Sequence, residues 1–75
     1  MPTFNGHKNW NHWNVSLWLN NDEGLYRTAR ELKRHHGSAG GAVAMLDELS
    51  DMGKIETPDG APYSVTTIRA AMGDM

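Results

Sequence analysis

Hydrophobic side chains recur at helical spacing near the start of the chain. Trp10, Trp13 and Leu17 stand at positions i, i+3 and i+7, which predicts a helix from about Trp10 to Asn20. Three more apolar residues widen this stripe almost around the helix: Val15, Trp18 and Leu19. A helix this apolar cannot lie alone on a surface. The indoles are therefore predicted to be mainly core, with Trp18 or Trp10 partly open as an interface anchor.

Capping residues mark two further helices. Asn9 or Asn11 is expected to cap the first helix, and Asn20-Asn21 to stop it. Asp22 caps a second helix that runs to a terminating glycine at Gly37. Its predicted inner face is Leu25, Ala29 and Leu32. A third helix spans about residues 39 or 41 to 52 and stops at Gly53, with five inward residues: Ala42, Met45, Leu46, Leu49 and Met52.

The helical period stops after Gly53. Ile55 and Tyr63 flank the sequence Pro58-Asp59-Gly60, in which proline presets φ and glycine accepts a positive φ. A short hairpin or wing-like loop is expected here. Ser64 or Thr66 then caps a last helix with three inward residues: Val65, Ile68 and Met72.

These elements predict one small, mostly α domain over residues 1–75. It has three to four short helices around an aromatic core, with the hairpin-like loop before the last helix. Residues 1–8 are expected to form an extended arm, because they are polar apart from Phe4 and are broken by Pro2 and Gly6. A chain of 75 residues buries little surface, and without cysteine it cannot use a disulfide.

Charge is divided unevenly along the chain. The formal net charge of −2 argues against a uniformly basic, nucleic-acid-binding surface. An acidic group can imitate phosphates and bind a partner's nucleic-acid-binding surface: Asp47, Glu48, Asp51, Glu56 and Asp59. A basic group is the alternative binding face, suited to phosphate contact: Arg27, Arg30, Lys33, Arg34 and Arg69. For each group, an ordinary solvated face is the competing interpretation.

The tryptophan-rich segment carries a resemblance. Residues 9–26 contain the pattern NW-x-x-WNV-x-LW-x-x-ND-x-x-LY, carried by Asn9, Trp10, Trp13, Asn14, Val15, Leu17, Trp18, Asn21, Asp22, Leu25 and Tyr26. It is similar to a family of small uncharacterised proteins from phages and prophages. The resemblance implies a phage origin. Small phage proteins of this size are often anti-defence factors, including anti-CRISPR proteins that bind a host effector without enzymatic turnover.

The C-terminal half resembles a helix, loop and helix segment of the large serine recombinases. The resemblance is carried by Leu46, Leu49, Gly53, Thr57, Pro58, Gly60, Tyr63, Ser64, Thr67 and Arg69. In that family the segment belongs to a DNA-contacting region. This chain departs from the family in charge, because Asp59 occupies a place that is often basic and only Arg69 is cationic in the helix after Ser64.

No catalytic or metal-binding pattern is present, so the chain is expected to be no enzyme and to need no cofactor. Ser16 and His12 are four residues apart, but this spacing is common. The segment GSAGGA, residues 37–42, lacks the lysine of a phosphate-binding loop. The four histidines contain no H-x-x-x-H pair, and no cysteine could complete a zinc site: His7, His12, His35 and His36.

Two functions are therefore expected. The first is a phage-encoded, non-enzymatic inhibitor of the anti-CRISPR type, which binds a host CRISPR surveillance complex and blocks its nucleic-acid recognition. The alternative is a small helix-turn-helix or winged-helix DNA-binding protein, with four residues at the start of its recognition helix: Ser64, Thr66, Thr67 and Arg69. A homodimeric structural protein is a third interpretation.

The expected location is the host-cell cytoplasm, without a membrane partner. No apolar run approaches the roughly 20 residues that span a bilayer. The first ten residues have neither the charged start nor the apolar run of a secretory signal.

Overall fold

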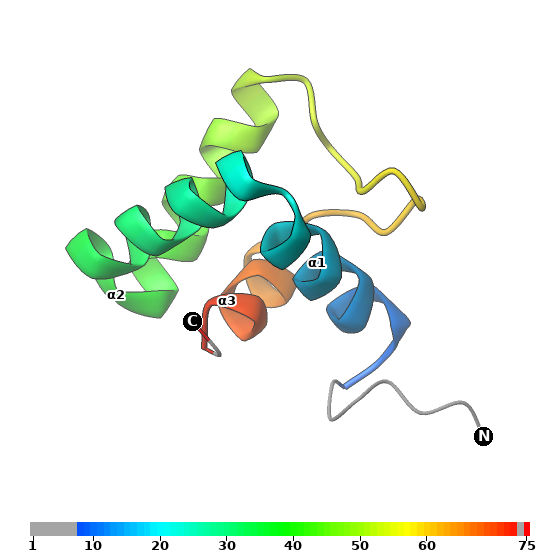
Figure 1. Cartoon of the computed structure of the whole chain (residues 1–75), viewed down its shortest axis with the longest axis horizontal. Coiled ribbons are helices and arrows are strands. Elements are labelled where there is room, and N and C mark those ends of the chain that lie inside the picture. Colours follow the sequence, from blue (N-terminus) through cyan, green and yellow to red (C-terminus); the bar gives the residue numbers. More distant parts are fainter. Residues whose placement is uncertain (1–7, 74) are drawn as a thin grey trace.

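Three helices make up most of the part of the chain that the computed structural model describes, residues 8–73 and 75. They are α1 (Trp10–Asn21), α2 (Glu23–Asp51) and α3 (Val65–Gly73), and α3 packs against both of the others (Figure 1). These residues contain no strand, only one isolated antiparallel bridge between Glu56 and Pro62. The predicted small α domain is confirmed, while the expected arm at residues 1–8 lies outside the described residues except for Lys8.

Side-chain caps begin α1 and α2 where the sequence predicts them. The Asn9 side chain accepts a hydrogen bond from the His12 N–H at 3.0 Å, and the Asp22 side chain accepts one from the Leu25 N–H at 3.0 Å. Asp22 has an extended backbone and is at once the C-cap of α1 and the N-cap of α2. The two helices therefore follow each other without a linker.

α2 folds back on itself at Gly37. A straight helix of 29 residues would be about 43 Å long, which exceeds the longest dimension of the molecule, 37 Å. Gly37 has a φ of 76°, a value that glycine adopts without strain, and it divides α2 into a first arm, residues 23–36, and a second arm, residues 38–51. Figure 1 shows the second arm returning beside the first. The predicted glycine stop is confirmed, and the predicted third helix is the second arm of α2.

The core is aliphatic, with Tyr63 as its one aromatic member among the described residues. It comprises Val15, Leu19, Leu25, Ala29, Ala42, Met45, Leu49, Ala61, Tyr63, Ile68, Ala71 and Met72. The prediction of an aromatic core is wrong. α1 turns His12, Val15, Ser16 and Leu19 inward, whereas Trp13 and Trp18 are half-buried and Trp10 is 39% exposed.

Helix spacing explains this error. The apolar residues of α1 lie almost around the helix, and the side that meets the core also carries His12 and Ser16, so periodicity alone does not say which side faces inward. Ala29, Ala42 and Ala71 are fully buried on α2 and α3, and small side chains of this kind let neighbouring helices approach closely, which leaves less room for indole rings.

Two other residues predicted to point inward do not. Met52 is 51% exposed because it is the C-cap of α2, where the chain leaves the helix and no neighbouring element covers it. Val65 lies in the first turn of α3 and is also exposed. The remaining predicted inward residues of these helices are buried or packed against the core.

The segment between α2 and α3 forms the predicted hairpin-like loop. The Gly60 N–H donates to the Thr57 carbonyl at 2.9 Å, closing a turn in which Gly60 has a φ of 95°. The Tyr63 N–H donates to the Ile55 carbonyl at 3.0 Å, which draws the two sides of the loop together. Ser64 is the cap of α3, since its hydroxyl accepts from the Thr67 N–H at 3.1 Å.

Candidate functional site

A polar cluster ties the loop to α1. The Asn14 amide and the Trp18 indole N–H both donate to Asp59 Oδ2, each at 2.9 Å. The Thr57 hydroxyl donates to the Asn14 side-chain carbonyl and accepts from the Ala61 N–H at 3.0 Å. We call Asn14, Trp18, Thr57 and Asp59 the loop pin. It joins residues more than 40 positions apart in sequence.

The loop pin gives Asp59 a structural role. Hydrogen bonds from Asn14 and then from Trp18 stabilise the carboxylate, and they lower the pKa of Asp59 from its ordinary value. Asp59 was predicted as a partner-binding residue of the acidic group. Its carboxylate is exposed, and its Oδ2 accepts hydrogen bonds from two side chains of the same chain.

The other four acidic residues lie at the end of α2 and in the loop that follows it, and we call them the acidic face. Asp47, Glu48, Asp51 and Glu56 are all exposed, and within residues 8–73 none of them forms an ion pair. Three strongly exposed apolar residues lie on the same stretch of chain: Val43, Met52 and Ile55, the last 70% exposed. We include these three in the acidic face. A shallow groove of about 580 Å³ runs along the second arm and is lined by Val43 and Asp47 among others.

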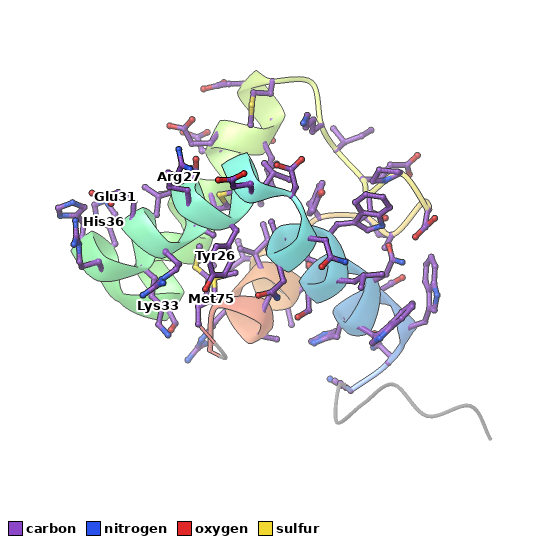
Figure 2. All side chains as sticks on the ribbon, in the orientation of Figure 1. Tyr26, Arg27, Glu31, Lys33, His36 and Met75 are labelled. Atoms are coloured by element: carbon purple, nitrogen blue, oxygen red, sulfur yellow. The ribbon has the colours of Figure 1, made fainter. Side chains whose placement is uncertain are left out.

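The predicted basic residues of the first arm line a second, open groove. This basic groove has a volume of about 750 Å³ and is lined by Glu23, Tyr26, Arg27, Arg30, Glu31, Lys33, Arg34 and Met75. Figure 2 shows Tyr26, Lys33 and Met75 gathered on one side of the first arm. Arg69, the fifth member of the predicted basic group, lies on α3 and does not line this groove.

Two carboxylates organise the cations of the basic groove. Arg27 pairs with Glu23 at 3.0 Å, and Arg34 pairs with Glu31 at 3.0 Å. Hydrogen bonds from His35 and then from Arg34 lower the pKa of Glu31. The Arg30 guanidinium lies 5.7 Å from the centre of the Tyr26 ring, within range of a cation–π contact. Among the described residues, acidic and basic side chains thus pair with each other on the first arm, whereas no ion pair involves the acidic face.

The proposed recognition helix is largely engaged in its own fold. The Ser64 N–H donates to the Thr67 hydroxyl at 3.0 Å, and the Thr67 N–H returns a bond to the Ser64 hydroxyl. Thr67 is also buried. Only Thr66 and Arg69 stay exposed for contact with a base, so the helix-turn-helix alternative keeps two of its four proposed residues.

The described residues contain no activated nucleophile and no group that could hold a metal ion. His12 and Ser16 are both buried, and the hydrogen bonds of Ser16 go to Asn20 rather than to His12. Burial, together with the negative charge of Asp22, raises the pKa of Tyr63, which keeps this phenol protonated. His7 lies outside the described residues.

Comparisons place the chain in a family. It belongs to a family of unknown function, DUF7249, whose family model matches residues 1–75. No curated protein and no solved structure matches the chain. Over the described ranges, no helix has both the length and the apolar character needed to cross a membrane.

Proposed function

We propose that this member of the family is a non-catalytic binding protein that docks, through its acidic face, on the nucleic-acid-binding surface of another protein. The observation that carries the proposal is the contrast between the two arms of α2. The carboxylates of the second arm have no cationic partner among the described residues, whereas those of the first arm are paired. Unpaired exposed carboxylates are free to steer toward a positively charged partner.

The geometry of the acidic face suits an interface. Asp47 and Asp51 are one helical turn apart on the same side of the second arm, and Glu48 lies beside them. Met52 and Ile55 extend this surface with exposed apolar side chains. Apolar anchors surrounded by charge are the usual composition of a protein interface, because the anchors supply affinity and the charges supply orientation and association rate.

The finer proposal is that the partner is a host CRISPR surveillance complex and that the chain is a phage-encoded inhibitor. Its support is the resemblance of residues 9–26 to small phage proteins. Six of the eleven pattern residues serve the fold. Asn9 and Asp22 cap helices, Asn14 and Trp18 belong to the loop pin, and Val15 and Leu25 are buried in the core. The acidic face lies outside this pattern, so the pattern does not determine which partner the acidic face binds.

The test is a DNA-binding assay with a purified CRISPR surveillance complex and its target duplex. We expect stoichiometric addition of the protein to abolish target binding. The variant Asp47→Asn/Glu48→Gln/Asp51→Asn should lose this inhibition, because it removes three charges without changing side-chain size. The matched control is Glu23→Gln/Glu31→Gln, which removes carboxylates from the first arm and should inhibit at least as strongly as the unaltered protein does. Equal inhibition by the acidic-face variant, or no inhibition by the unaltered protein, rejects the proposal.

A further inference from the structure

We infer that the basic groove on the first arm of α2 binds single-stranded nucleic acid, through its phosphates and through one stacked base. This inference concerns a different surface from the acidic face and does not depend on the proposed function. It rests on the placement of four cations and one aromatic ring around a single open groove of about 750 Å³.

The cations are spaced to follow a strand. Arg27, Arg30 and Arg34 are exposed and lie three and four residues apart, so they share one side of the helix over a rise of about 10 Å. Each guanidinium can donate two parallel hydrogen bonds to one phosphate. With Lys33 the groove holds four positive charges against the two carboxylates of Glu23 and Glu31, which leaves it positive although the whole chain is negative.

Glu23 and Glu31 hold two arginine side chains in place at the groove, where an anion could replace the carboxylates. Each carboxylate holds one guanidinium at 3.0 Å, in pairs whose side chains are more than half exposed. Exposed ion pairs are weak, so an incoming phosphate can displace the carboxylates at little cost. The carboxylates and a bound phosphate compete for the same donors. Removing the carboxylates should therefore strengthen binding, whereas a purely structural role would predict no gain.

Tyr26 distinguishes a nucleic-acid strand from other polyanions. Its ring lines the groove and is half-buried, and the Arg30 guanidinium lies over it. An aromatic ring next to arginines offers a surface on which an unpaired base stacks, and this combination is common in proteins that bind single strands. A duplex keeps its base faces covered, and an acidic peptide has no base to stack.

The experiment is fluorescence anisotropy with a short, labelled single-stranded DNA and the isolated protein at several salt concentrations. Contact with about three phosphates predicts a slope of about −2 for log K against log salt. Arg30→Glu should abolish binding at low salt, and Tyr26→Ala should weaken it about fivefold or more. Glu23→Gln/Glu31→Gln should strengthen it. The matched control is Lys54→Glu, the same charge change at an exposed residue outside the groove, which should leave affinity nearly unchanged.

Several outcomes would overturn the inference. Equal loss of affinity in Arg30→Glu and Lys54→Glu would show that only net charge matters. Equal affinity for a duplex of the same length, or equal competition by polyglutamate, would refute the single-strand assignment. No binding at low salt would refute it outright. Because the assay contains no CRISPR complex, its failure is separate from failure of the proposed function.

Discussion

Replacing Asn14 with alanine tests whether the loop pin holds the fold together. The Asn14 side chain is 1% exposed, accepts from the Thr57 hydroxyl and donates to the Asp59 carboxylate. Alanine removes both bonds and leaves the buried Thr57 hydroxyl without an acceptor. A buried donor that loses its partner costs about 1–3 kcal/mol. The Asp59 carboxylate is exposed and keeps its bond from Trp18, so it adds little to this cost.

The expected loss is large for so small a protein. At roughly 0.05–0.15 kcal/mol per residue, a chain of 75 residues has a free energy of unfolding of about 4–11 kcal/mol. A loss of about 2 kcal/mol should lower Tm by about 8–16 °C. The measurement is urea unfolding followed by circular dichroism, with thermal unfolding as a second readout.

A double-mutant cycle separates the Asn14–Thr57 bond from other effects of the substitution. Thr57→Val removes the hydroxyl while keeping the side-chain shape, and the double variant Asn14→Ala/Thr57→Val should show a coupling energy of at least about 0.5 kcal/mol. Asn20→Ala is the control. The Asn20 amide also makes a side-chain hydrogen bond within α1, donating to the Ser16 carbonyl at 2.7 Å, but Asn20 is exposed. If Asn14→Ala were no more destabilising than Asn20→Ala, the loop pin would not stabilise the fold.

Three further predictions follow from single contacts. Hydrogen bonds from Asn14 and Trp18 hold the pKa of Asp59 in the folded protein below its value in the unfolded chain. The stabilisation of the fold by these bonds is therefore present above the unfolded pKa and is lost as pH falls through the folded pKa. Asp59→Asn should therefore flatten the loss of urea stability below about pH 4, and identical pH profiles would contradict this. Gly41→Ala should lose about 1–3 kcal/mol, since its Cβ would lie 3.1 Å from the backbone of the first arm, whereas Gly73→Ala meets nothing within 4 Å and should not destabilise the fold. Met72→Ala should cost about 2–5 kcal/mol in the fully buried core and Met52→Ala under about 0.5 kcal/mol; similar urea midpoints for the two would refute this assignment of the core.

The candidate site was predictable only in part. Exposure of Asp47, Glu48 and Asp51 follows from their places on a predicted helix, and so does exposure of Arg27, Arg30 and Arg34. The pairing of Glu23 with Arg27 is a neighbour relation within one helix and can also be inferred from spacing. The engagement of Asp59 was not predictable, because its partners lie more than 40 positions away. No local pattern in the sequence predicts a contact between residues so far apart in the chain.

The sequence by itself determined where the helices begin and end. Asn9, Asp22 and Ser64 cap them, and Gly37 and Gly53 stop them, because capping bonds and positive φ values depend only on residues a few positions apart. Tertiary structure decided which side of α1 faces inward. Apolar residues lie on more than one side of that helix, so its periodicity does not choose between them. In the folded chain Val15 and Leu19 are fully buried, whereas Trp13 and Trp18 are half-buried and Trp10 is exposed.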